Sequence, residues 1–152
     1  MVKDLVIPNG VTSIGSYTFK NCNRLANITI PDSVTNIGED AFSGCRRLIS
    51  ITIGNGVMNI GNNAFDGTAW YNNQPSGLVY AGKIAYIYKG TMPSNTLITI
   101  KEGTVGIASF AFRNYENLTS IIIPNSMTNI GESAFEYCSG LKTVFYAGTG
   151  EQ

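Results

Sequence analysis

A repeat of about 23 residues runs through most of the chain and limits the folds that it can adopt. Residues 25–31 align with residues 48–54 one period later, and the same unit returns at residues 118–124. A further copy begins at Leu141, again one period after Leu118. A fixed period of this length predicts a solenoid, in which each repeat forms one coil and stacks on its neighbours.

Each unit begins with a strand and then turns. Ile28 and Ile30 alternate with polar residues, which is the period of a strand with one buried face. The positions that recur after the strand are a valine or methionine, an isoleucine, a glycine and a phenylalanine. Their columns are Val11, Val34, Val57 and Met127; Ile14, Ile37, Ile60, Ile107 and Ile130; Gly15, Gly38, Gly61 and Gly131; and Phe19, Phe42, Phe65, Phe112 and Phe135. We expect these columns to superimpose, coil upon coil, in one elongated core.

The glycine and phenylalanine columns carry further expectations. The glycines predict either a turn with positive φ or a close approach of two backbones. The Ala-Phe pairs, which follow acidic residues such as Glu39 and Asp40, predict one turn of helix with acids near its positive end. Ordering a coil costs about 1–2 kcal/mol per residue, whereas each buried side chain returns only about 1.5–3 kcal/mol. A coil therefore needs neighbours, and we expect the strands to form one continuous parallel sheet.

Residues 69–97 depart from the repeat and form an irregular coil. Residues 78–88 are typical of a β-hairpin, with residues 81–83 as its turn. The aromatic residues of this insert, which include the single tryptophan of the chain, are Trp70, Tyr71, Tyr80, Tyr86 and Tyr88. Two interpretations stay open: an exposed aromatic surface for sugar or peptide, or rings that pack onto neighbouring coils and fill the space of a missing coil.

The recurring pattern Leu-x-x-Ile-x-Ile-Pro-x-x-Val-x-x-Ile-Gly-x-x-Ala-Phe-x-x-Cys resembles the BspA-type leucine-rich repeat of microbial surface proteins. The chain departs from it where Gly54 and Lys101 replace proline, and where Thr68 and Tyr115 replace cysteine. The resemblance implies an α/β solenoid, a right-handed leucine-rich-repeat superhelix of about six coils with one parallel sheet, short helical turns and the hairpin insert. It also implies a cell-surface or secreted location, and adhesion to extracellular matrix and cells.

The composition argues against several kinds of partner. Only 13% of residues are charged, ten Lys and Arg balance ten Asp and Glu, and no run of like charge occurs. No nucleic acid and no anionic membrane surface is expected as main partner, since both need concentrated positive charge; a local patch formed by the fold stays open. No apolar stretch approaches the roughly 18–20 residues that span a bilayer, so no membrane insertion is expected. The N-terminal residues show no secretion signal.

The chain has no histidine, which removes the commonest general base, the Ser-His and Cys-His pairs, and the usual zinc ligand. No phosphate-binding or calcium loop occurs, and the carboxylates mostly lie at turn positions of the repeat, where solvation is their simplest role. We therefore expect no enzyme activity, no cofactor and no metal.

Three cysteines occupy one column of the repeat. Cys22 and Cys45 are expected about one strand spacing apart, which is within disulfide range, while Cys138 has no close partner. Parallel side-chain directions disfavour the torsion that a disulfide needs, so we expect small buried thiols. A cross-link between Cys22 and Cys45 is the alternative.

The outward side of the sheet is the main candidate for binding. Residues between the buried isoleucines point outward and align as Val6, Thr29, Thr52, Thr99, Ile122 and Phe145, of which the last five form the candidate binding face. Beside them run Asp4, Asn27, Ser50, Ser120 and Thr143. A ladder of hydroxyl groups with few charged side chains forms a flat platform that suits an extended protein or a glycan. The alternative is that threonine simply suits an exposed strand.

These observations predict a single leucine-rich-repeat domain over residues 1–152, a fragment of a longer repeat protein. Both ends enter the pattern without polar caps, which indicates either such a fragment or, as the alternative, end-to-end self-association. The expected function is a non-enzymatic, protein-binding repeat module for cell-surface adhesion or recognition, with extracellular-matrix or host-surface proteins as the suspected partners. The alternatives are a structural spacer or stalk in a larger surface protein, and carbohydrate binding through the aromatic insert.

Overall fold

The computed structural model describes residues 3–147, which divide into two compact units between Pro75 and Ser76. Unit 1 is the part of the chain up to Pro75, and unit 2 is the part from Ser76 onward. Each unit is a stack of coils with two sheets, and each is described by itself. The expectation of a single domain stays a prediction.

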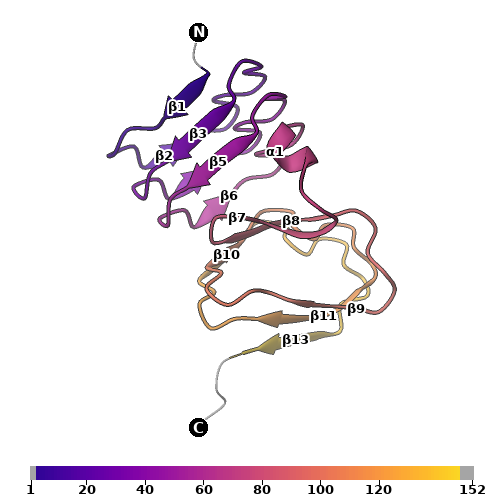
Figure 1. Ribbon diagram of the computed structural model, residues 1–152. Helices are drawn as coiled ribbons and strands as arrows, with labels where there is room; N and C mark the ends of the chain where they lie inside the picture. The colour runs from indigo at the N-terminus through magenta and orange to yellow at the C-terminus, as the bar shows by residue number, and fades with distance from the viewer. Residues whose placement is uncertain (1–2, 148–152) are drawn as a thin grey trace. The chain divides into compact units, whose positions relative to one another are not determined.

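In unit 1, each coil carries one longer strand and one two-residue strand. The longer strands form a parallel sheet of β1 (Asp4–Val6), β3 (Asn27–Ile30) and β5 (Ser50–Ile53), which lie side by side in Figure 1. The short strands form a second parallel sheet of β2 (Ser13–Ile14), β4 (Asn36–Ile37) and β6 (Asn59–Ile60). Ile28 pairs with Ile51, and Ile37 with Ile60. Paired residues are therefore one period apart, and the predicted register is confirmed in this unit.

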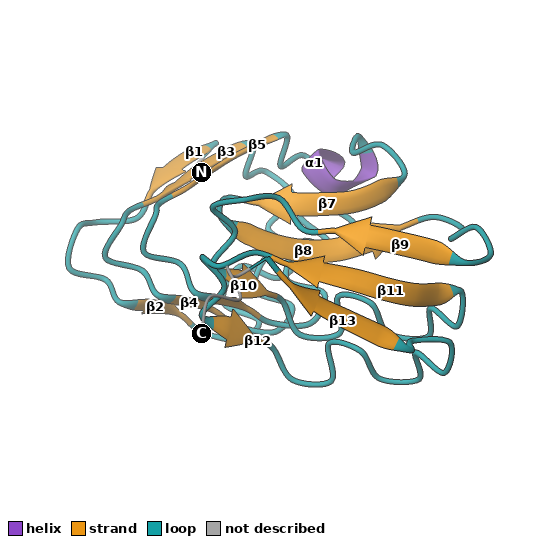
Figure 2. Ribbon diagram, turned by 90° about the horizontal axis from the view of Figure 1, so that it is seen from below, coloured by secondary structure: helices purple, strands orange, loops and turns teal. Residues whose placement is uncertain are grey.

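Unit 2 repeats the two-sheet plan around a hairpin. Its longer strands form a parallel sheet of β9 (Thr96–Thr99), β11 (Leu118–Ile123) and β13 (Thr143–Tyr146), which Figure 2 shows side by side. The second sheet contains β12 (Asn129–Ile130), β10 (Gly106–Ile107), β8 (Ile84–Lys89) and β7 (Gly77–Ala81), in that order. The predicted solenoid of short coils is confirmed.

The arrangement of the strands differs from the single continuous sheet that was expected. In the described residues they form four separate sheets, two in each unit, and β7 pairs antiparallel with β8. The reason lies within the coil, because the chain turns after the longer strand and then runs extended again for two residues before the glycine, as at Asn36 and Ile37. These two residues pair with the equivalent residues of the next coil, so a coil contributes to two sheets.

The segments that hold the Ala-Phe pairs differ from the expected helical turns. Their N–H groups alternate between two kinds of acceptor: Phe42 N donates to Ala64 O of the next coil (2.8 Å), whereas Cys45 N donates to Phe42 O of its own coil (3.1 Å). Asp40, at the start of this segment, has a positive φ of 52°. A helix directs every N–H along its own chain, so the bonds between coils impose turns instead. Among the described residues the only α-helix is α1 (Ala69–Asn72).

The glycine column marks a close approach of two backbones. A Cβ atom added to Gly61 would lie 2.5 Å from the N atom of Glu39 in the preceding coil. One added to Gly131 would lie 2.9 Å from the Cα atom of Ser109. Neither glycine has a positive φ. Of the two expectations for this column, the close approach is therefore the one confirmed.

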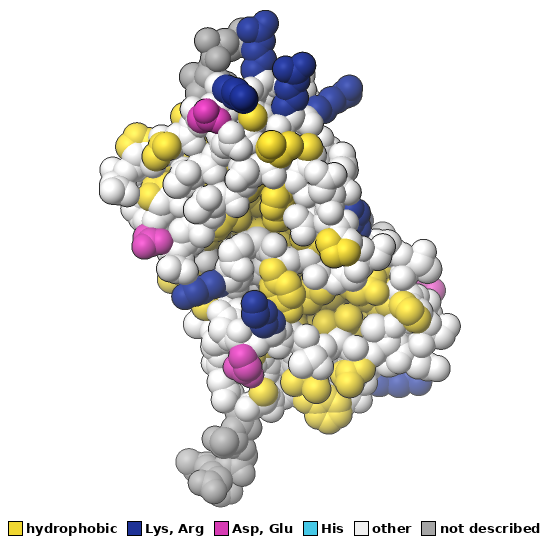
Figure 3. Space-filling model, viewed as in Figure 1, with side chains coloured by type: hydrophobic (Ala, Val, Ile, Leu, Met, Phe, Trp, Pro, Cys, Tyr) yellow, Lys and Arg dark blue, Asp and Glu magenta, His cyan; other side chains and the backbone are white. Residues whose placement is uncertain are grey.

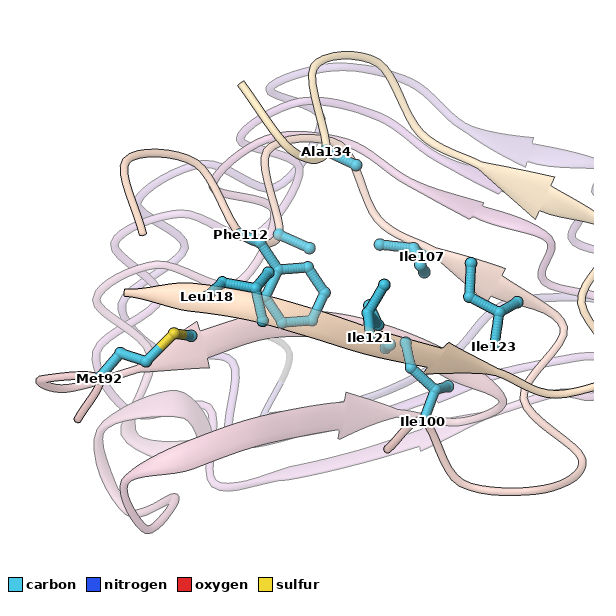
Figure 4. Close-up of a cluster of buried hydrophobic side chains, with 10 residues drawn as sticks. Met92, Ile100, Ile107, Phe112, Leu118, Ile121, Ile123 and Ala134 are labelled. Carbon is cyan, nitrogen blue, oxygen red and sulfur yellow. The ribbon is translucent and has the colours of Figure 1, made fainter. Parts of the chain in front are cut away.

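The phenylalanine column forms a stacked ladder within each unit. In unit 1 the ring centroids of Phe19 and Phe42 lie 5.2 Å apart, and those of Phe42 and Phe65 lie 5.6 Å apart. In unit 2 the rings of Phe112 and Phe135 stack at 5.3 Å. Figure 4 shows the core around Phe112, which contains Met92, Ile100, Ile107, Leu118, Ile121, Ile123 and Ala134. The predicted superposition of this column is confirmed within each unit.

The irregular coil contains the predicted hairpin. β7 and β8 pair antiparallel with Ala81 opposite Ile84, and the turn between them includes Gly82 at a φ of 59°. Ile84 also pairs in parallel with Gly106 of β10, so the hairpin supplies the strand that a regular coil would provide. The pairing register between β7 and β8 shifts between Val79 and Tyr80.

Two residues that replace the column cysteine hold the irregular coil in place. Thr68 caps α1, because its hydroxyl accepts a hydrogen bond from Tyr71 N (3.0 Å) and donates one to Phe65 O (2.7 Å). In unit 2, the Tyr115 hydroxyl donates to the carbonyl oxygen of Tyr88 on β8 (3.0 Å). Both departures from the repeat therefore have a local structural role.

Candidate binding surface

An outward-facing ladder crosses the longer sheet of unit 1. Val6 pairs with Thr29, and Thr29 pairs with Thr52, so the three side chains stack across β1, β3 and β5. All three are exposed, Val6 at 68%. The neighbouring residue Ile28 is buried, as the alternation of a strand with one buried face requires. The structure thus brings Thr29 and Thr52 together, as predicted.

A second ladder crosses the longer sheet of unit 2. Thr99 pairs with Ile122, and Ile122 pairs with Phe145. Thr99 and Phe145 are exposed, the latter at 51%, and Ile122 is half-buried. The predicted binding face therefore consists of two ladders, one in each unit. The ladder of unit 2 is the more apolar of the two.

Sequence reasoning missed one exposed residue beside the second ladder. Leu97 pairs with Ser120, which pairs with Thr143, and Leu97 is 53% exposed. The repeat period could have identified Leu97 as an outward position, because Leu97 lies one period before Ser120 in the sequence. Leu97 adds apolar surface next to Thr99 on the same strand.

The side chains of these ladders suit contact with another molecule and offer no group for covalent chemistry. They supply hydroxyls, methyl groups and one aromatic ring. In the flanking column of unit 1, Asn27 Nδ2 donates to Asp4 Oδ1 of the neighbouring strand, so the carboxylate there is already partnered. A partner that covers this face removes few charged groups from water. Desolvation of charged groups is the costly part of burying polar surface.

The aromatic residues of the insert that belong to unit 1 lie against the last regular coil of that unit. The Trp70 ring meets the Phe65 ring edge-on, with centroids 5.2 Å apart, and Trp70 N donates to Leu48 O (2.7 Å). Trp70 and Tyr71 are both half-buried. Burial raises the pKa of the Tyr71 hydroxyl above its ordinary value, and the negative charge of Asp66 raises it further.

The remaining insert tyrosines belong to unit 2 and contact its coils. Tyr86 is only 3% exposed, and the Tyr88 ring meets the Tyr115 ring edge-on at 4.9 Å. The Tyr80 hydroxyl accepts a hydrogen bond from Lys101 N (2.9 Å). Every aromatic residue of the insert is thus buried or half-buried. Their use as a binding surface stays a prediction.

The three cysteines are free thiols in different environments. Cys45 is fully buried and its Sγ donates to Phe19 O of the preceding coil (2.9 Å), and burial raises its pKa to about 11. Cys138 is half-buried, its Sγ donates to Phe112 O (2.8 Å), and burial raises its pKa as well. The prediction of a buried thiol is confirmed for Cys45 and wrong for Cys22, which is exposed. Cys22 belongs to the first coil, which has a described neighbour on one side only.

Residues 3–147 contain no group of three or more cysteine, aspartate or glutamate side chains arranged to hold a metal ion. Within the same residues, no helix has the length and apolar character needed to cross a membrane.

Comparison with known proteins identifies the repeat. The family model described as the BspA type leucine rich repeat region matches residues 1–86 and 83–150, with six copies. The chain belongs to this family. Proteins built from such repeats bind partners through their extended surfaces and are typically non-enzymatic, so membership indicates a protein-interaction repeat module.

Several solved structures are similar to the chain. A leucine-rich cell surface protein from Faecalibacterium prausnitzii is 32% identical over 98% of this chain and 33% of its own, with a TM-score of 0.49. A leucine-rich repeat protein from T. pallidum is 26% identical over 93% of this chain and 57% of its own, also with a TM-score of 0.49. The chain therefore spans about a third and somewhat over half of these two relatives. No curated protein matches it.

Proposed function

We propose that the chain is a non-enzymatic module that binds a protein partner outside the cell, in adhesion or in recognition of a host or partner protein. The observation that carries this proposal is the pair of exposed ladders, Val6–Thr29–Thr52 and Thr99–Ile122–Phe145. The extracellular location is supported by the F. prausnitzii relative, which is described as a cell surface protein.

The ladders suit an extended partner because parallel pairing repeats the same side-chain position at a spacing of about 4.7–4.9 Å. In unit 1 this repeats a methyl group and a hydroxyl, from Thr29 and Thr52. In unit 2 it places Phe145 beside Ile122, and interfaces are enriched in aromatic side chains of this kind. Neither ladder contains a charged side chain, so a partner that covers it leaves no charge unpaired.

The proposal is tested by adding charge to the ladders. The variant Thr29→Lys, Thr52→Lys and Thr99→Lys is compared with the unchanged chain in solid-phase binding to a panel of purified extracellular-matrix proteins. We expect the variant to lose at least about tenfold in affinity, because three ammonium groups would have to be desolvated in the interface. The control is Thr12→Lys with Asn55→Lys, since both residues are exposed and lie outside the ladders.

The result that contradicts the proposal is a ladder variant that binds as well as the unchanged chain, which moves the site elsewhere. Failure of the unchanged chain to bind any protein of the matrix panel contradicts matrix adhesion. Circular dichroism of both variants establishes that they are folded before binding is compared.

A structural spacer is the second candidate function. It is supported by the packing of the insert, in which Tyr86 is buried and Trp70 contacts Phe65. Iodide quenching of Trp70, the single tryptophan of the chain, separates this candidate from a sugar-binding aromatic surface. Weak quenching favours packing, whereas strong quenching together with signals on a glycan array favours carbohydrate binding.

A further inference from the structure

Three arginines lie on the equivalent turns of two neighbouring coils in unit 1. Arg24 lies just before β3, and Arg46 and Arg47 lie just before β5. The backbone ladder continues into this turn, since Ala26 N donates to Lys3 O (2.7 Å) and Ile49 N donates to Ala26 O (2.9 Å). Arg47 therefore occupies the register position of Arg24 one coil further on, about 4.7–4.9 Å away along the stack. Figure 3 shows Lys and Arg side chains gathered on this part of the surface, near the N-terminus.

Within residues 3–147, no carboxylate neutralises these arginines. All three are exposed and none of them forms an ion pair in the described residues, whereas Lys20 pairs with Asp40 (3.3 Å) and Arg113 pairs with Glu136 (2.9 Å). Within unit 1 the acidic residues of the second coil lie on other turns, with Asp32 after β3 and Glu39 and Asp40 after β4. Asp4 on the neighbouring strand β1 is also close to this turn, and its carboxylate accepts a hydrogen bond from Asn27 Nδ2. Like charges held about one strand spacing apart repel one another, and an anion between them relieves that repulsion.

An aromatic side chain lies on the neighbouring coil. Trp70 N donates to Leu48 O (2.7 Å), so the backbone of Trp70 lies against the residue that directly follows Arg47. Trp70 is half-buried, with its ring edge-on to Phe65. An indole beside guanidinium groups is a combination suited to a charged sugar, since the ring offers an apolar face and the guanidinium offers paired N–H donors.

We propose that Arg24, Arg46 and Arg47, with Trp70 beside them, bind a sulfated polysaccharide. A guanidinium group holds a tetrahedral oxyanion through two parallel N–H···O bonds. Sulfate groups along a linear polysaccharide can engage arginines that are stacked along the solenoid. Duplex nucleic acid fits less well, because its non-specific binding depends on several phosphate contacts over a wide basic surface, and the remaining Lys and Arg of the chain are balanced by acids.

The site is confined to unit 1. Aligning Leu118 of unit 2 with Leu48 of unit 1 places Glu116 and Asn117 at the positions of Arg46 and Arg47. The equivalent turn of unit 2 therefore carries a negative charge. This surface is separate from the threonine ladders, so its test does not depend on the protein partner proposed above.

The proposal is tested with heparin as the probe. The full chain is applied to heparin-agarose at physiological ionic strength, and affinity is measured by titration at several salt concentrations. The variant Arg24→Gln, Arg46→Gln and Arg47→Gln is compared with a matched variant of unit 2, Lys83→Gln, Lys101→Gln and Lys142→Gln, whose targets are also exposed. Both variants lose three positive charges, the first from the arginines of unit 1 and the second from lysines of unit 2.

We expect the arginine variant to bind heparin at least about tenfold more weakly and with a shallower salt dependence, because fewer counterions are released. The lysine variant is expected to stay within about twofold of the unchanged chain. Equal losses in the two variants, or no binding of the unchanged chain, overturn the proposal. Equal binding of chemically desulfated heparin overturns sulfate recognition, and tighter binding of duplex DNA than of heparin assigns the patch to nucleic acid instead.

Discussion

Unit 1 follows the repeat closely, whereas unit 2 replaces part of a coil with a hairpin and keeps the same two-sheet plan. In unit 1 three phenylalanines stack in succession and the strands pair at a constant offset. In unit 2 the hairpin strand β8 takes the place of a short strand, with Ile84 and Ala85 pairing to Gly106 and Ile107. The comparison shows that a coil can be replaced when the substitute supplies backbone partners and buried side chains.

The two units differ more on the surface than in the core. The longer sheet of unit 1 shows threonines outward and that of unit 2 shows Ile122 and Phe145, while the turn before the strand carries arginines in unit 1 and Glu116 in unit 2. Core positions are held by stacking, so they admit few residue types. Outward positions are free of that demand, and functional differences are expected there.

Among the variants that test this comparison, Phe42→Ala is expected to lower the free energy of unfolding most. Phe42 is fully buried and stacks on a ring at each side, so its removal leaves a cavity that costs about 3–5 kcal/mol. Phe135→Ala in unit 2 serves as the partner variant, because Phe135 is half-buried and stacks on Phe112, and a smaller loss is expected. Urea unfolding followed by circular dichroism measures both, and equal losses would show that the second stacked ring contributes nothing.

Gly61→Ala is expected to lower the free energy of unfolding by a smaller amount. The new Cβ atom would lie 2.5 Å from Glu39 N, and moving two backbones apart costs about 1–3 kcal/mol. Gly15→Ala is the matched control, since a Cβ atom there meets only the Thr18 hydroxyl oxygen at 3.3 Å. The midpoint of thermal unfolding is measured for both variants, and a lower midpoint is expected for Gly61→Ala. Similar midpoints would contradict the close backbone approach as the reason why glycine recurs in this column.

Tyr115→Phe tests how unit 2 holds its hairpin. The Tyr115 hydroxyl lies 3.0 Å from the carbonyl oxygens of both Tyr88 and Gly90, and removing it leaves these acceptors short of a donor at a cost of about 1–2 kcal/mol. The ring contact with Tyr88 remains, so the fold is kept. Hydrogen exchange of the β8 amides is expected to accelerate, while exchange of β3 in unit 1 is the internal control. Unchanged exchange in β8 would show that the ring alone is sufficient.

The fold was predictable from the period because hydrophobic columns repeat in the sequence itself. Ile28 and Phe42 could be assigned to the core from their columns alone. The second sheet was not predictable, since a two-residue strand such as β4 has no periodicity of its own and forms only because the next coil lies beside it. The same holds for the arginine turn: Arg24 and Arg47 are one full period apart in sequence, and a count of total charge hides their proximity.

The last effect depends on pH and concerns Cys45, the thiol that the stack buries. Burial raises its pKa from the ordinary value of 9.0 to about 11, so between these pH values the folded chain keeps a proton that the unfolded chain has lost. Its contribution to stability is therefore complete below about pH 9 and declines as the pH rises toward 11. The free energy of unfolding is measured from pH 8 to 11 for the unchanged chain and for Cys45→Ala, because the difference between the two curves cancels the other titrating groups. We expect that difference to shrink with rising pH, and a constant difference would mean that the buried thiol does not titrate in this range.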